Sequence, residues 1–213
     1  PETLEPYSGG IGYGTEILCD EVDPKIDPLS EENKIVLTTG PLTGTMAPMH
    51  PQACIVTKSP LANSILDCYA GGFLGAAVKF SGIDGIILEG KAPEWSIILV
   101  GNGKVSFHDA SPVMGKSTSE TEEWMKKKFG NDVVTLSIGV AGENLVAMAA
   151  IFSETRTFGR GGSGAVLGSK RIKGMAVRGT GAVEVLDSAK FSSLVKDNMK
   201  LIQESCSQEY SLV

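Results

Sequence analysis

Two segments of this 213-residue chain resemble each other, and this internal similarity constrains the fold more than any other sequence feature. The first copy combines IVLTTG (35–40) with GGFLGAAVKFSGIDGIILEG (71–90), and the second combines VTLSIG (134–139) with GGSGAVLGSKRIKGMAVRG (161–179). In each copy a β-branched strand ends at glycine, a loop leads to a Gly-Gly pair, and a short helix precedes a last strand. Two copies are too few for a solenoid, so we expect a pseudo-twofold pair with neighbouring Gly-Gly turns.

The two Gly-Gly turns are suited to binding an anion. Glycine lets a backbone approach a ligand closely, and N–H groups at a helix start carry a partial positive charge. Arg156 and Arg160 flank the second turn and can donate charge-assisted hydrogen bonds to phosphate. Glycine is also expected where a helix packs tightly on a sheet, so the arginines are what favour binding. We predict that Ala70-Gly71-Gly72 and Arg160-Gly161-Gly162 form a paired cradle for one large anionic cofactor.

Other local patterns predict the remaining elements. Asn102-Gly103 between apolar runs predicts a hairpin over 95–108, and the spacing of Ser117 and Glu120 predicts a capped helix ended by Gly130. Further helices are expected over 13–22, 72–80 and from Asp187 onward, and further strands over 34–39, 53–57, 83–89, 133–138, 145–152 and 172–177. We expect a base domain over 1–182, with repeats at about 34–90 and 133–179, followed at 183–213 by the first helix of another domain.

Composition narrows the class of protein. The net charge is −6, so nucleic acid is not an expected partner. No apolar stretch approaches the roughly 20 residues needed to cross a bilayer, and the acidic start does not resemble a signal peptide. The scattered cysteines, at positions 19, 54, 68 and 206, indicate reduced thiols in a cytoplasmic protein without a cysteine metal site. Because the chain opens on Pro1, we expect its natural start to lie upstream.

Several stretches between Gly9 and Gly179 resemble the N-terminal domain of the tungsten-containing aldehyde ferredoxin oxidoreductase family. They are DPLSEENK (27–34), TGPLTGT (39–45), VTKSPL (56–61), AGGFLGAAVKFSG (70–82), GVAGENL (139–145) and GRGGSGAVLGSK (159–170). The resemblance implies an α+β fold of two pseudo-symmetric β-sheet repeats with short helices. It also implies a base for a bis-pterin cofactor that holds tungsten, or sometimes molybdenum, with magnesium bridging the pterin phosphates.

The resemblance assigns site residues in both repeats. The implied cofactor-binding residues are Gln52, Tyr69, Ala70, Gly71, Gly72, Arg156, Thr157, Gly159 and Arg160. The backbone carbonyls of Tyr69 and Thr157 would bind magnesium, and the chain would contribute no catalytic residue. Gln52 departs from the family pattern, because a neutral amide replaces an arginine at a phosphate. Met49-His50-Pro51 departs as well, and His50 lies in a loop that could face the cofactor.

The implied function is the cofactor-binding N-terminal part of a tungsten bis-pterin aldehyde:ferredoxin oxidoreductase in an anaerobe. Such an enzyme oxidises an aldehyde to a carboxylic acid and passes electrons to ferredoxin. The family's 4Fe-4S cysteines and acid/base residues lie beyond Val213, so the isolated chain should not turn over. Ferredoxin and the C-terminal domains are the implied partners, and the resemblance is compatible with an oligomer. Two alternatives stay open: a stand-alone pterin-binding or assembly module, and the catalytic subunit of an aryl-CoA reductase. The aldehyde and the choice of metal are not specified.

Overall fold

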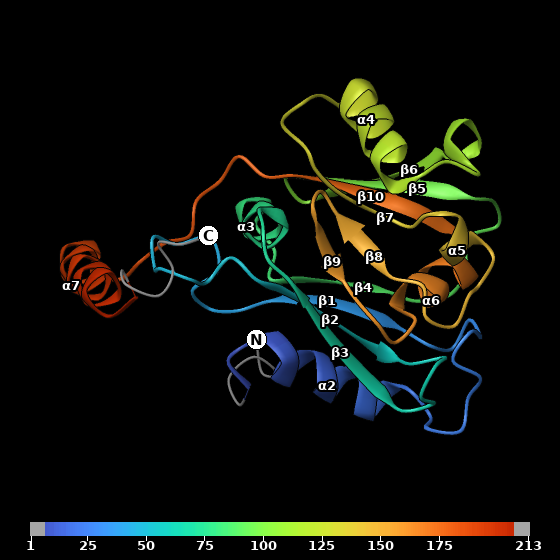
Figure 1. The fold of residues 1–213 in the computed structure, drawn as a ribbon, viewed down its shortest axis with the longest axis horizontal. Coiled ribbons are helices and arrows are strands. Elements are labelled where there is room, and N and C mark those ends of the chain that lie inside the picture. Colours follow the sequence, from blue (N-terminus) through green and yellow to red (C-terminus); the bar gives the residue numbers. More distant parts are fainter. Residues whose placement is uncertain (1–6, 207–213) are drawn as a thin grey trace.

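The computed structural model describes residues 7–206, which form two β-sheets packed face to face with helices between and outside them (Figure 1). The first sheet has the order β3-β2-β1-β4 and the second β6-β5-β10-β7-β8-β9. The strands of the first are β1 (Ile35–Thr39), β2 (Ala53–Lys58), β3 (Ile65–Ala70) and β4 (Gly85–Leu88). Those of the second are β5 (Ser96–Gly101), β6 (Lys104–Asp109), β7 (Val134–Ser137), β8 (Ile151–Ser153), β9 (Arg156–Phe158) and β10 (Ile172–Arg178).

The strand orders confirm the predicted fold of two repeats. β3-β2-β1-β4 in the first sheet corresponds, strand for strand, to β9-β8-β7-β10 in the second. A short helix precedes the last strand of each repeat, α3 (Leu74–Phe80) before β4 and α6 (Ser163–Ser169) before β10. A longer helix precedes the first strand, α2 (Gly10–Glu21) before β1 and α4 (Thr118–Phe129) before β7. Within residues 7–206, the hairpin β5–β6 has no counterpart in the first repeat.

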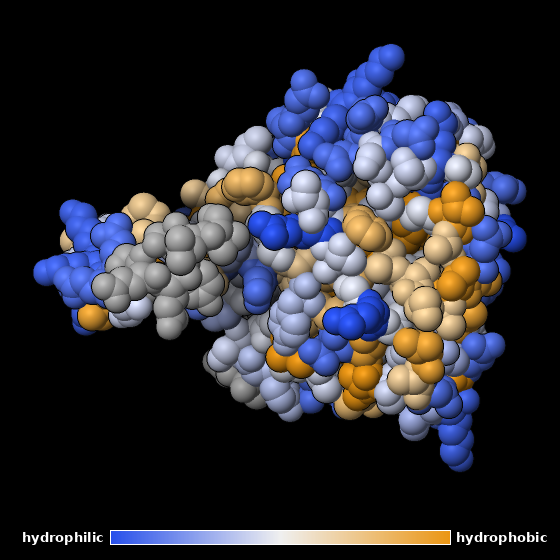
Figure 2. Space-filling model, in the orientation of Figure 1, coloured by the Kyte–Doolittle hydropathy of each residue, from blue (hydrophilic) through white to orange (hydrophobic). Residues whose placement is uncertain are grey.

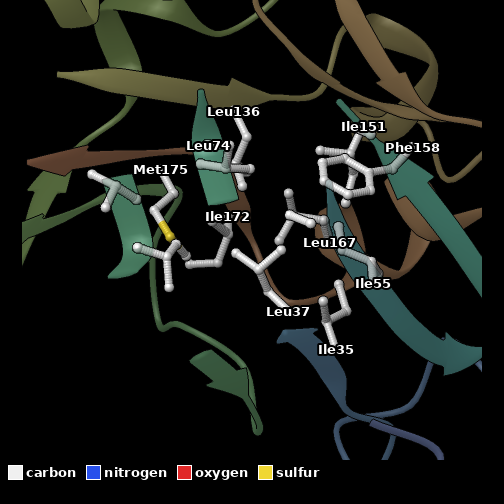
Figure 3. Packing of buried hydrophobic residues seen from close by; sticks show 14 of the residues in the cluster. Ile35, Leu37, Ile55, Leu74, Leu136, Ile151, Phe158, Leu167, Ile172 and Met175 are labelled. Atoms are coloured by element: carbon white, nitrogen blue, oxygen red, sulfur yellow. The ribbon is translucent and has the colours of Figure 1, made fainter. Parts of the chain in front are cut away.

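The central core lies between the sheets. Figure 3 shows Ile35, Leu37 and Ile55 of the first sheet facing Leu136, Ile172 and Met175 of the second, with Leu74 of α3 and Leu167 of α6 beside them. The outer faces are covered too: Leu18 of α2 and Val22, which follows that helix, pack on β2, and Met125 of α4 packs on the second sheet. Burial on both faces explains why all of β1 and β2 and most of β10 are buried, with no alternation between buried and exposed residues.

The strongest local predictions are confirmed. Asn102 and Gly103 both have positive φ, 47° and 77°, as a two-residue hairpin turn requires. Ser117 accepts a hydrogen bond from the Glu120 N–H, and the Glu120 carboxylate accepts one from the Ser117 N–H, so α4 begins with a capping box. Gly130 ends α4 with φ of 107°.

The predicted strand over 145–152 is wrong for most of its length. Val140–Glu143 forms a short helix, α5, and Leu145 follows it with φ of 55°. The backbone then turns, with the Ala149 N–H donating to the Val146 carbonyl, and β8 begins only at Ile151. The segment covers α6, whose Gly164 N–H donates to the Ala149 carbonyl. Apolar content here reflects packing on a helix, which short apolar runs do not distinguish from a strand. The sequence prediction also missed β3, β9 and the 3₁₀ turn η1 (Ser111–Val113).

The last described helix, α7 (Ser188–Cys206), extends to one side of the sheets at the end of an extended segment (Figure 1). The Asp187 carboxylate accepts from the Lys190 N–H and so caps the helix as predicted. A groove lies between the helix and the loop after β1, lined by Leu42, Ala47, Pro48, Met49, His50, Phe191, Leu194, Val195, Asn198 and Ile202. Leu186, Leu194 and Leu201 stay exposed. None of the described helices is long and apolar enough to cross a membrane.

Candidate functional site

The edge strands of the two repeats, β3 and β9, lie against each other where the sheets meet. We call this region the seam: residues 69–72 at the end of β3 and residues 156–160 in and after β9. It brings together eight of the nine residues that the sequence assigned to the cofactor, and Gln52 lies beside it. The register Ala53↔Ala70, carried one residue further, places Gln52 opposite Gly71.

The first glycine turn is open. A Cβ atom added at Gly71 would have no other atom within 4 Å. Gly72 has φ of 90°, a conformation that favours glycine, and its added Cβ would lie 3.4 Å from Cγ of Arg156. An arginine of the second repeat therefore packs against the turn of the first. Backbone here is available for the close approach of a ligand.

The second glycine turn is filled by the protein itself, although the sequence analysis expected both turns to form a cradle for the cofactor. A Cβ atom at Gly161 would lie 2.4 Å from the Leu66 side chain, and one at Gly162 only 2.2 Å from the Ala147 carbonyl. The Ser59 hydroxyl donates to the Gly161 carbonyl at 2.6 Å. Glycine is needed at this turn because the two repeats pack on it.

The arginines beside the filled turn remain accessible. Arg156 and Arg160 are both exposed, while Thr157 and Gly159 are half-buried. Among the ion pairs of the described residues, none involves Arg156 or Arg160. Arg160 adopts φ of 39°, which directs the chain sharply from β9 into the turn. Figure 2 shows strongly hydrophilic side chains in the middle of this face, surrounded by paler and more apolar surface. The guanidinium donors are free to meet an anion.

A polar hollow of about 170 Å³ adjoins the open turn. His50, Gln52 and Tyr69 line it together with Thr43. Thr43 holds the loop in place, since its hydroxyl accepts from the Gly40 N–H at 3.1 Å and donates to the Gln52 carbonyl at 3.4 Å. The sequence analysis did not single out Thr43, and a buried threonine within a matched motif carries no separate signal of such a role.

Two ionisable groups at the hollow, the Tyr69 phenol and the Cys54 thiol, stay protonated at neutral pH. Burial, with smaller contributions from the neighbouring Cys54 thiol and Asp67 carboxylate, raises the pKa of Tyr69 to about 12. Burial likewise raises the pKa of the Cys54 thiol to about 11, although its hydrogen bond with Tyr69 acts in the other direction. Neither group is a nucleophile in this state. Tyr69 and Cys54 therefore offer hydrogen bonding at the hollow rather than an anionic nucleophile.

The residues at the seam fit an anionic cofactor with phosphate groups. Gly71 borders open space, and the exposed Arg156 and Arg160 supply donors that form no ion pair with the carboxylates of the described residues. No three His, Cys, Asp or Glu side chains in the described part of the chain are grouped to hold a metal ion.

Three buried lysines support the fold rather than the site, and the sequence analysis did not single them out. Lys58 donates to the carbonyls of Pro24 and Ile26, both at 2.6 Å. Lys170 donates to three carbonyls, of Asn33 at 2.5 Å, Gly90 at 3.0 Å and Glu31 at 3.4 Å, and burial lowers its pKa to about 8. Lys173 is fully buried and pairs with Glu143 at 2.5 Å. These ammonium groups donate hydrogen bonds to loop carbonyls that have no partner in the hydrogen-bond ladders of the sheets.

The chain is similar in sequence and in structure to known proteins. The family model described as "Aldehyde ferredoxin oxidoreductase, N-terminal domain" matches residues 1–179. The chain is 44% identical over 205 residues to a tungsten-containing aldehyde ferredoxin oxidoreductase of Pyrococcus horikoshii, covering 95% of this chain and 34% of the relative. It is 34% identical over 217 residues to an aliphatic sulfonate oxidoreductase, WOR-like subunit, of Pyrococcus furiosus, with 93% and 34% covered.

A solved structure agrees with the sequence relatives. It is described as the active site complex BamBC of benzoyl coenzyme A reductase with 1,5 dienoyl-CoA, and it matches with a TM-score of 0.93 at 36% identity. The match covers 96% of this chain and 31% of that one. The chain thus spans about a third of the length of the proteins it matches.

Proposed function

The chain belongs to the aldehyde ferredoxin oxidoreductase family, and from that premise we propose that it is the part that holds the bis-pterin cofactor of a tungsten-dependent aldehyde oxidoreductase. The observation that carries the proposal is the contact between the open turn at Gly72 and Arg156 of the other repeat. That contact joins an unobstructed backbone to a free guanidinium, which is the combination that phosphate recognition needs.

We assign each side of the seam a separate role. Ala70, Gly71 and Gly72 would let the cofactor lie close to the backbone, with Gln52 beside them. Arg156 and Arg160 would donate to its phosphates, with Gly159 giving the chain room to turn. The backbone carbonyls of Tyr69 and Thr157 would bind magnesium, which prefers oxygen ligands. The burial of the surrounding strands keeps these groups fixed before the cofactor arrives.

When bound, the tungsten or molybdenum bis-pterin would supply the redox chemistry that converts an aldehyde to a carboxylic acid. The chain's own residues bind and orient it, and a 4Fe-4S cluster and acid/base groups would belong to the remainder of the polypeptide. Electrons would pass through that cluster to ferredoxin. We further propose that the enzyme acts in the cytoplasm of an anaerobe, and that this chain alone does not oxidise aldehydes. The division at about residue 182 into a base domain and a following helical domain is part of the same proposal.

The proposal is tested by cofactor content. The complete polypeptide, purified without oxygen, should contain tungsten or molybdenum together with pterin, measured by elemental analysis and by the fluorescence of the oxidised pterin. Arg156→Ala should lower both at least threefold, because a charged phosphate donor is lost. Arg171→Ala is the matched control, since Arg171 donates to the Pro93 carbonyl instead. Equal cofactor content in the Arg156→Ala variant and the wild type would contradict the proposal.

A second activity within the family is favoured by the structural match at a TM-score of 0.93 to a benzoyl coenzyme A reductase complex. The same base could serve an aryl-CoA reductase, because the base binds cofactor while other parts of the protein shape the substrate pocket. Assays of the complete polypeptide with aldehydes and with aryl-CoA thioesters separate the two activities. Viologen reduction by aldehydes supports the first, and turnover of aryl-CoA thioesters alone supports the second.

A further inference from the structure

The family resemblance implies an arginine at the position where this chain has Gln52, and the structure brings another nitrogen donor, His50, to the same hollow. His50 lies two residues before Gln52 at the entrance to β2, and both side chains are exposed. Both line the polar hollow of about 170 Å³ that adjoins Tyr69. The lining of this hollow contains no carboxylate that would compete for the imidazole. An imidazole N–H is therefore available on the side of the seam that carries no guanidinium.

The loop that carries His50 is held from several sides. Met49 has φ of 62°, a conformation that costs energy in a residue other than glycine and that persists only where surrounding structure imposes it. Thr43 fixes the two ends of the loop through Gly40 and the Gln52 carbonyl. On its other side the loop meets α7, where Met49 and His50 border the groove that Phe191 and Val195 also line. His50 is thus presented on a defined turn.

We propose that His50 binds a phosphate of the pterin cofactor on the first repeat, in place of the positive charge that Gln52 does not provide. The inference rests on the proposed function, because it requires a phosphate at the seam. Gln52 contributes a neutral amide donor, and His50 adds a second donor that carries charge when protonated. The first repeat then holds its phosphate with a histidine and an amide, and the second repeat uses Arg156 and Arg160.

The test compares cofactor retention in the complete enzyme. Wild type, His50→Ala, His50→Arg and His108→Ala are purified without oxygen and dialysed against rising salt. Metal and pterin per polypeptide are then measured. His108 is the other histidine of the chain and lies on β6 against Phe129, 4.8 Å between ring centroids, so its variant controls for the loss of an imidazole. His50→Ala should release cofactor at least threefold faster than wild type, and His50→Arg should retain it at least as well. His108→Ala should match the wild type.

A second substitution separates binding from folding. Adding Gln52→Arg to the His50→Ala variant should restore retention to the wild-type level, because it returns a guanidinium to the hollow. Equal release from wild type and His50→Ala, or no recovery with Gln52→Arg, would overturn the inference. Wild-type enzyme without any pterin would instead overturn the proposed function, so the two failures are distinguishable.

Discussion

The two glycine pairs occupy equivalent places in the two repeats, yet the protein uses them differently. Gly72 and Gly162 have nearly the same φ, 90° and 89°, and each precedes a short helix. At the first pair Gly71 borders open space, whereas the second is filled by Pro60, Leu66 and Ala147. One pair leaves room for a ligand and the other lets the repeats pack together. The same sequence signal thus has two physical causes, and only the surroundings distinguish them.

The repeats also differ in the burial of their lysine–glutamate ion pairs, and substitutions at these pairs should give the largest difference in stability. Lys173→Met should lower the free energy of unfolding by about 3–5 kcal/mol, because Glu143 would stay buried without its partner. Lys34→Met in the first repeat should cost about 1 kcal/mol or less, because the Glu21 and Glu89 carboxylates of those pairs are solvent-exposed. Denaturant unfolding of both variants measures the difference. Equal losses in the free energy of unfolding would contradict this difference between the ion pairs of the two repeats.

The glycine pairs themselves provide the next test. Gly162→Ala should destabilise the chain by about 3 kcal/mol, since its Cβ would overlap the Ala147 carbonyl in a backbone conformation unfavourable for alanine. Gly71→Ala should change stability by about 0.5 kcal/mol or less, because nothing lies within 4 Å of the added atom. Thermal and denaturant unfolding report both values. If Gly71→Ala proved as costly as Gly162→Ala, the first turn would not be open.

A pH effect is expected at the junction of the repeats, where Lys170 of the second donates to the Asn33 and Gly90 carbonyls. Burial lowers the Lys170 pKa to about 8 from 10.5, so between these values the unfolded chain binds more protons than the folded one. Stability should therefore rise with pH through this window, by about 1–3 kcal/mol relative to Lys170→Met. Unfolding curves of both proteins from pH 7 to 10 check the sign. A parallel pH dependence in the two proteins would exclude this role of Lys170.

The smallest effect concerns the side chain of Tyr69. Its proposed contact with magnesium uses the backbone carbonyl, so Tyr69→Phe should leave the magnesium content of the complete enzyme unchanged. The lost hydroxyl contact with Cys54 should cost about 1 kcal/mol or less in stability. Elemental analysis and thermal unfolding measure the two quantities. A loss of magnesium in Tyr69→Phe would show that the side chain takes part.

Much of the fold could be predicted because its signals are local or repeated. The capping box at Ser117 and the turn at Asn102-Gly103 depend on a few adjacent residues, and the duplication predicted the pairing of two equivalent units. The strand β9 was missed because three residues carry too little periodicity. The tight packing around Gly162 could not be predicted from the sequence either. Pro60 is distant along the chain, and its contact with this turn arises only when the repeats meet. The site residues came from family resemblance, and their separation into an open and a filled turn came from the structure.

The asymmetric seam is tested most directly by a crystal structure of the complete enzyme with anomalous scattering recorded at the tungsten edge. We expect metal density above the seam, with pterin phosphates beside Gly71 and in contact with Arg156. The Gly161–Gly162 turn should remain packed against Pro60 and Leu66 with no phosphate on it. Metal density away from β3 and β9, or a phosphate seated on Gly161–Gly162, would contradict the account.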